Sequence, residues 1–112
     1  SHERWRRYAS PVWMDINFSN TLNAKAAREN DDERHVCPMA LDLIERAIQL
    51  WSNHGDVVFD PFSGIGSTGY QAIRMGRKFA GSELKTAYFE QAVKNIGSAK
   101  ANQGALFDSE AV

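Results

Sequence analysis

The pattern of apolar and polar positions predicts a helix and then a strand in the middle of the chain. Apolar residues recur at three- and four-residue spacing, which is typical of a buried helix face; they are Ala40, Leu43, Ile44, Ala47, Ile48 and Trp51. The opposite, outward face carries Asp42, Glu45, Arg46 and Gln49. Pro38 suits the first helical position, where an N–H has no intrahelical partner. The β-branched run 57–59 then predicts a short buried strand.

A second helix and strand follow, and a third helix comes after them. Residues 70–75 predict a short helix that Gly76 ends, and residues 78–83 predict a strand that ends in Glu83. A helix between two strands makes the strands parallel, with a right-handed crossover. Thr86 is placed to cap the third helix, whose inward face is expected to hold Phe89, Ala92, Val93 and Ile96. The predicted fold class is α/β.

The two ends of the chain carry weaker patterns. Residues 4–8 are basic and aromatic, and we expect a solvated lead-in with Trp5 packed on the domain; contact with nucleic acid is the alternative. Residues 11–16 predict an extended segment or a strand, and residues 17–33 predict a long polar loop. From Gly97 onward the chain is polar and is expected to fray, apart from the apolar pair 106–107.

Composition narrows the class of protein. The 112 residues are 43% hydrophobic with a net charge of −1, which indicates a folded chain without a general attraction for nucleic acid. The single cysteine, Cys37, cannot form an internal disulfide and fits a reducing cytoplasm. No apolar run reaches the length of a membrane span. His35 and Cys37 lack a further Cys/His pair, and the acidic run 31–33 lacks the spacing of a calcium loop, so no metal site is predicted.

The strongest functional signal is the glycine-rich turn between the first strand and its helix. Gly64, Gly66 and Gly69 match the spacing G-x-G-x-x-G, and Glu83 ends the next strand about 20 residues on. Such glycines let the backbone approach a ligand, and the helix start offers free N–H groups. A carboxylate at the second strand end can accept both hydroxyls of a ribose. The pattern predicts an adenosine-containing cofactor; the alternative is that the glycines only form tight turns.

Asp60 separates two kinds of adenosine cofactor. It stands at the end of the first strand, just before the glycines. A carboxylate there would repel the pyrophosphate of a dinucleotide and attract an ammonium group. S-adenosylmethionine carries an α-amino group, a sulfonium and a ribose, and it has no phosphate. Asp60 together with Glu83 therefore favours S-adenosylmethionine over a dinucleotide.

Residues 59–68, with the sequence FDPFSGIGST, resemble the cofactor motif of DNA amino-methyltransferases, which modify adenine N6 or cytosine N4. Residues 35–39, with Leu41 and Ile44, are similar to the segment that precedes this motif in the circularly permuted β group. Residues 76–83 and 88–89 are similar to the strand and helix that follow it. The resemblance covers about residues 13–96 and is closest to phage-type enzymes of the group.

The resemblance implies a Rossmann-like methyltransferase fold that binds S-adenosylmethionine. The residues that it implies for cofactor binding are Asp60, Phe62, Gly64, Gly66, Ser67 and Thr68, with Glu83 on the ribose and Pro38, His35 and Cys37 framing the pocket. Many members of the family have a Lys where this chain has Cys37. We expect one partial domain over 1–112, with a cofactor-binding core over 11–100 and a flexible tail over 101–112.

One departure from the family concerns catalysis. The family's catalytic loop has the form (Asp/Asn/Ser)-Pro-Pro-(Tyr/Phe) and holds the flipped target base. This chain contains no Pro-Pro pair. The resemblance therefore implies a C-terminal portion of a methyltransferase, inactive alone, in which no residue is assigned to methyl transfer.

Three partners and two alternative functions follow from these patterns. DNA is the implied substrate of the intact enzyme, and an incomplete sheet edge is expected to promote self-association. The tail residues Gln103, Leu106 and Phe107 fit Q-x-x-L-F, which resembles peptides that dock on the replication sliding clamp. The alternatives are a NAD-type dinucleotide-binding oxidoreductase fragment and a non-catalytic module that acts by binding a partner.

Overall fold

The computed structural model describes residues 1–27 and 37–110, with side chains described for 1–25 and 37–104. The elements in chain order are α1 (His2–Tyr8), a 3-10 helix η1 (Ala24–Ala27), α2 (Leu41–Trp51), β1 (Val57–Asp60), α3 (Ser67–Arg74), β2 (Lys78–Gly81) and α4 (Thr86–Glu110). Across the described residues, no helix has both the length and the apolar character needed to span a membrane.

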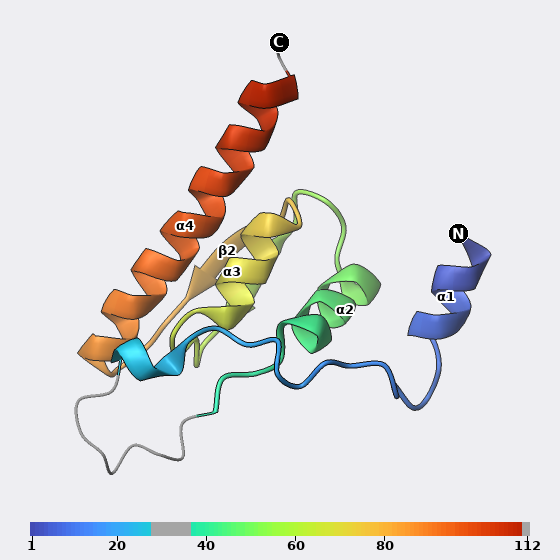
Figure 1. Cartoon of the computed structure of the whole chain (residues 1–112), viewed down its shortest axis with the longest axis horizontal. Coiled ribbons are helices and arrows are strands. Elements are labelled where there is room, and N and C mark those ends of the chain that lie inside the picture. The colour runs from blue at the N-terminus through green and yellow to red at the C-terminus, as the bar shows by residue number, and fades with distance from the viewer. Residues whose placement is uncertain (28–36, 111–112) are drawn as a thin grey trace.

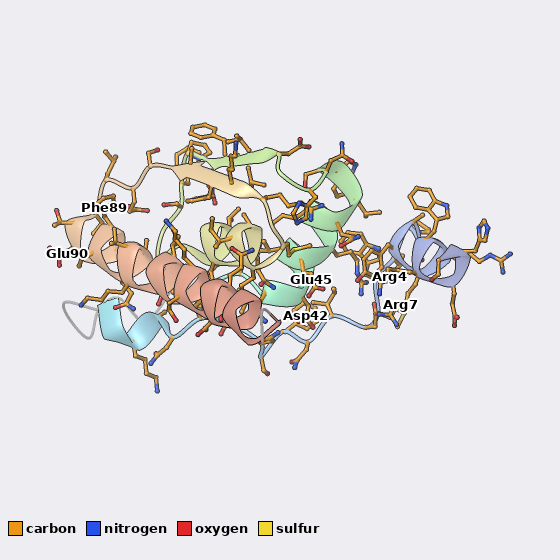
Figure 2. All side chains as sticks on the ribbon, turned by 90° about the horizontal axis from the view of Figure 1, so that it is seen from above. Arg4, Arg7, Asp42, Glu45, Phe89 and Glu90 are labelled. Atoms are coloured by element: carbon orange, nitrogen blue, oxygen red, sulfur yellow. The ribbon has the colours of Figure 1, made fainter. Side chains whose placement is uncertain are left out.

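The strand–helix–strand unit has the predicted parallel arrangement. β1 pairs with β2 in parallel, from Val57 opposite Lys78 to Asp60 opposite Gly81. α3 connects the two strands and ends before Gly76, which has a positive φ of 76° and donates to the Ile73 carbonyl. α3 lies between the strands and α4 (Figure 2). Both strands therefore end near the turn that opens α3.

The first strand is less buried than predicted. Val57 and Phe59 on one side of β1 are 63% and 66% exposed, whereas Val58 on the other side packs on the core. The described sheet has two strands, and its helices lie on one side of it (Figure 2). An apolar run therefore does not by itself make a buried strand, because burial requires a covering layer on each face.

The core follows the predicted face of α2 at Ile44 and Ile48, with three exceptions. Its buried cluster is Leu41, Ile44, Ile48 and Ala72, and Leu41 was not expected on that face. Trp51 was expected inward but is 76% exposed, and Arg46 was expected outward but is only 5% exposed. The helix also begins at Leu41, not at Pro38, because the Leu41 N–H donates to the Asn20 carbonyl at 2.8 Å and fixes the helix start there.

α4 differs most from the prediction. It runs through Gly97 to Glu110, where the sequence predicted fraying. Thr86 is its first helical residue and not its cap. Ala92 is buried as predicted, but Phe89 and Val93 are exposed, and Figure 2 shows Phe89 at the outer margin of the molecule. α4 meets α3 through Ala92 and Ile96, which lie against Gly66 and Gly69, so Phe89 and Val93 lie outside the contact.

The N-terminal segment forms a helix that lies apart from the sheet (Figure 1). The Ser1 side chain caps α1 by accepting from the Arg4 N–H. Trp5 was expected to pack on the domain but is 63% exposed. Residues 11–16 form no strand. The acidic run 31–33 lies outside the described residues.

Arg46 on α2 holds the N-terminal segment against that helix. Its guanidinium donates to both carboxylate oxygens of Asp15, at 2.7 and 2.9 Å. It also lies over the rings of Tyr8 and Trp13, 4.6 and 5.1 Å from the ring centroids. Its Nε atom is buried without a partner. A buried arginine can thus replace an apolar residue on a core helix when a carboxylate and two aromatic rings enclose it.

We expect this contact to open in acid. The hydrogen bonds from Arg46 hold the pKa of Asp15 below its ordinary value of 3.8. Since the folded pKa is the lower one, the stabilisation is complete above about pH 4 and is lost as the pH falls through the folded value. In a Trp5→Phe/Trp51→Phe background, Trp13 fluorescence should change below pH 4.

An Asp15→Asn variant should abolish that acid transition and should resemble the acid form already at pH 7. Glu45→Gln is the matched control, because Glu45 is exposed on α2, the helix that carries Arg46. This variant should keep the wild-type transition. An unchanged transition in Asp15→Asn would show that another carboxyl group controls the contact.

Candidate cofactor-binding site

A cavity of about 240 Å³ lies at the carboxyl end of β1, where the chain turns into α3. It is lined by Cys37, Pro38, Met39, Asp60, Phe62, Ser63, Gly64, Ile65, Ser67, Thr68 and Tyr88. Most of the predicted cofactor residues thus surround one space, although they come from separate segments of the chain. Gly66 and Glu83 stand beside the cavity without lining it, and His35 lies outside the described residues.

Asp60 is held by hydrogen bonds on both of its carboxylate oxygens. The Phe62 N–H donates to Oδ1 at 2.9 Å, and the Thr68 hydroxyl donates to Oδ2 at 2.7 Å. Asp60 is half-buried, and each of its oxygens keeps capacity for a further donor. A fixed, partly desolvated carboxylate at this place can bind a cationic group of a ligand.

The three glycines of the turn have different surroundings. Gly64 has a positive φ of 53°, and a Cβ there would meet nothing within 4 Å. Gly66 caps α3 with a φ of 87°, and a Cβ on it would lie 3.0 Å from the Ala92 Cβ. A Cβ on Gly69 would lie 2.6 Å from the Ile96 Cδ1. The absence of a side chain at Gly66 and Gly69 therefore allows α4 to pack closely against them. Only Gly64 leaves open space next to the cavity.

Glu83 makes contacts that its place in the sequence did not reveal. Its Oε2 accepts from the Gly64 N–H at 2.8 Å, and its Oε1 accepts from the Lys85 N–H at 2.9 Å. The expected ribose ligand therefore also ties the glycine turn to the end of β2. Remaining lone pairs leave Glu83 able to accept hydroxyl groups as well.

Sequence reasoning did not assign Met39, Ser63, Ile65 or Tyr88 to the site. Met39 and Tyr88 lie in blocks that carry the family resemblance, which was the available signal. Met39 and Thr68 also line a second, apolar cavity of about 370 Å³ between α2 and β1. No group of three or more metal-ligating side chains occurs within the described part of the chain.

A parallel strand, a glycine turn, a helix and a second strand, with a carboxylate at each strand end, define a cofactor-binding α/β unit. The family model N6_N4_Mtase, described as DNA methylase, matches residues 2–94. The chain therefore belongs to this family of DNA methylases, as its sequence motifs indicated. This membership gives no support to the dinucleotide-dependent alternative.

Individual relatives agree with the family model. The chain is 30% identical over 102 residues to the Type II methyltransferase M.BamHI of Bacillus amyloliquefaciens, covering 90% of this chain and 22% of that protein. It is 39% identical over 64 residues to the DNA adenine methyltransferase YhdJ of Escherichia coli, covering 57% of this chain and 22% of YhdJ.

A solved structure confirms the fold class. The DNA modification methylase TTHA0409 of Thermus thermophilus, complexed with S-adenosyl-L-methionine, matches with a TM-score of 0.66 and 30% identity. The match covers 89% of this chain and 34% of TTHA0409. The chain thus spans about a fifth of the curated relatives and a third of this structure, and its fold is a partial Rossmann-like methyltransferase fold.

Proposed function

We propose that this chain is the S-adenosylmethionine-binding portion of a DNA methyltransferase that acts on adenine N6 or cytosine N4. The observation that carries the proposal is the cavity at the end of β1, with Asp60 fixed in its wall. The described residues that line this cavity include a carboxylate and no Lys or Arg. Such a lining suits a cationic ligand and disfavours a pyrophosphate.

The residues present fit this cofactor. Asp60 would accept from its ammonium group, and Glu83 would accept from its ribose hydroxyls. Phe62, Ser67, Thr68 and the turn at Gly64 and Gly66 would surround its methionine portion, with Pro38, His35 and Cys37 framing the same pocket. When bound, the cofactor supplies an activated methyl group. The residues of this chain position that donor, and none of them is assigned to the transfer itself.

Calorimetric titration of the folded chain with S-adenosylmethionine tests the proposal, with NAD as the matched control. We expect saturable binding of S-adenosylmethionine and none of NAD. Both ligands carry adenosine, so the difference in their affinities reports on the ligand group that lies next to Asp60. Absence of S-adenosylmethionine binding, or equal binding of NAD, would overturn the proposal.

Cys37 provides an independent measure of occupancy. It is the single cysteine of the chain, it is exposed, and it lines the cavity. Saturating S-adenosylmethionine should therefore slow its alkylation by iodoacetamide several-fold, whereas NAD should not. An unchanged alkylation rate under conditions in which calorimetry shows binding would place the ligand elsewhere.

The activity of an intact enzyme would require residues outside this chain. We infer that the catalytic loop comes from outside this chain, so the 112 residues alone should not methylate DNA. YhdJ is named as an adenine methyltransferase and M.BamHI as a Type II methyltransferase. The function proposed for this chain is compatible with either target base, and with a role in restriction-modification or in a phage. The single cysteine favours a reducing cytoplasm.

We also propose self-association through β1, which has an exposed apolar face and, within the described part of the chain, an unpaired edge. Val57 and Phe59 are exposed there, and one edge of β1 has no partner strand among the described residues. Sedimentation velocity should show concentration-dependent association that Phe59→Asp removes. Met14→Asp is the control, since Met14 is exposed on the N-terminal segment. A wild-type chain that stays monomeric at all concentrations would contradict this proposal.

The sliding clamp is the third proposed partner, through Gln103, Leu106 and Phe107. These residues fall within α4, so the tail would have to present them from a helix or unwind locally. Titration with a purified bacterial clamp should show binding that Leu106→Ala/Phe107→Ala abolishes. Equal binding by the chain and this variant would rule the motif out.

A further inference from the structure

The hydroxyl of Thr68 is committed to Asp60. Thr68 stands in the first turn of α3, and Asp60 ends β1. The Thr68 Oγ1 donates to the Asp60 Oδ2 at 2.7 Å, while the backbone N–H of Phe62 donates to Oδ1 at 2.9 Å. The two donors come from opposite sides of the glycine turn. Each carboxylate oxygen therefore has its own donor, and the rotation of the carboxylate plane is restricted.

We propose that Thr68 is a positioning residue that sets the orientation of Asp60 toward a cationic ligand group. This inference rests on the proposed function, because it takes the ammonium of S-adenosylmethionine as that group. An aspartate without this hydroxyl keeps only the Phe62 contact on Oδ1 and can turn Oδ2 away. Preorganising the carboxylate removes that freedom before the ligand arrives.

The surroundings of Thr68 allow the hydroxyl to be removed cleanly. Thr68 is half-buried and lines both the cofactor cavity and the apolar cavity between α2 and β1. Valine has nearly the shape of threonine and is compatible with that apolar side. Thr68→Val therefore deletes the hydrogen bond with little change in packing, and Thr68→Ser keeps the hydroxyl and deletes the methyl group.

The test compares two ligands that differ at the group Asp60 would meet. 5′-Deoxy-5′-methylthioadenosine keeps the adenosine and the S-methyl group of S-adenosylmethionine but lacks the amino acid portion and the positive charge on sulfur. Thr68→Val should weaken binding of S-adenosylmethionine by about threefold to tenfold, the cost of ordering one side chain when the ligand binds, and should change binding of 5′-deoxy-5′-methylthioadenosine less than twofold. Thr68→Ser should bind both ligands within about twofold of the wild type.

A merely structural role would give a different result. Loss of packing or of the helix start would weaken the binding of both ligands together. Equal weakening of both ligands, or unchanged binding of S-adenosylmethionine, would overturn the inference. In an Asp60→Ala background, Thr68→Val should cause no further loss, because the group that it positions is gone.

The same titrations separate this inference from the proposed function. If the wild type fails to bind S-adenosylmethionine, the proposed function fails. If the wild type binds and Asp60→Ala binds more weakly, while Thr68→Val binds normally, the cofactor assignment holds and the positioning role of Thr68 is wrong.

Discussion

Replacing Asp60 with alanine should weaken S-adenosylmethionine binding by roughly 10- to 100-fold, the range expected for loss of a hydrogen bond between charged groups. The carboxylate is fixed by Phe62 and Thr68, and it faces a cavity whose described lining holds no cation. Removing it deletes the attraction for an ammonium group. Calorimetric titration of the variant beside the wild type gives the ratio of dissociation constants.

Two controls make this result specific. Asp60→Asn keeps the size and the acceptor oxygen but removes the charge, and it should lose most of the same affinity. Asp56→Asn should bind as the wild type does, because Asp56 is exposed just before β1 and accepts from the Asn53 N–H. Wild-type affinity in Asp60→Ala would show that the ligand's cationic group lies elsewhere.

Replacing Gly69 with alanine should lower the free energy of unfolding by about 1–3 kcal/mol, as overpacking of a core does. A Cβ at this position would lie 2.6 Å from the Ile96 Cδ1 and 2.7 Å from the Phe79 Cδ1. It would therefore crowd the side chains of Ile96 and Phe79, which lie between α3 and its neighbours α4 and β2. Chemical denaturation monitored by circular dichroism gives the free energy of unfolding of each variant.

Gly97→Ala is the matched control, with an expected change of opposite sign. Gly97 lies inside α4, and a Cβ on it would meet nothing within 4 Å. Alanine there should raise the free energy of unfolding by about 0.5–1 kcal/mol, because glycine is the poorer helix former. Equal effects of the two substitutions would contradict the close packing at Gly69. No stabilisation by Gly97→Ala would contradict a continuous α4.

The sequence alone predicted the parts that depend on local patterns. The apolar spacing identified the buried face of α2 at Ile44 and Ile48, and the parallel strands followed from their helical connection. The glycine turn and Asp60 were placed correctly at the end of β1, since a motif of adjacent residues keeps its local geometry. Family membership followed from the same residues.

Only the tertiary structure decided which of these groups meet and which faces are covered. Arg46 is buried because Asp15, distant in sequence, and two aromatic rings enclose it, and Phe59 is exposed because no layer among the described residues covers its side of the sheet. Glu83 accepts from the Gly64 N–H because the second strand brings it there. Periodicity records the preference of each residue for burial, but partners and covering layers arise from segments far apart in the chain.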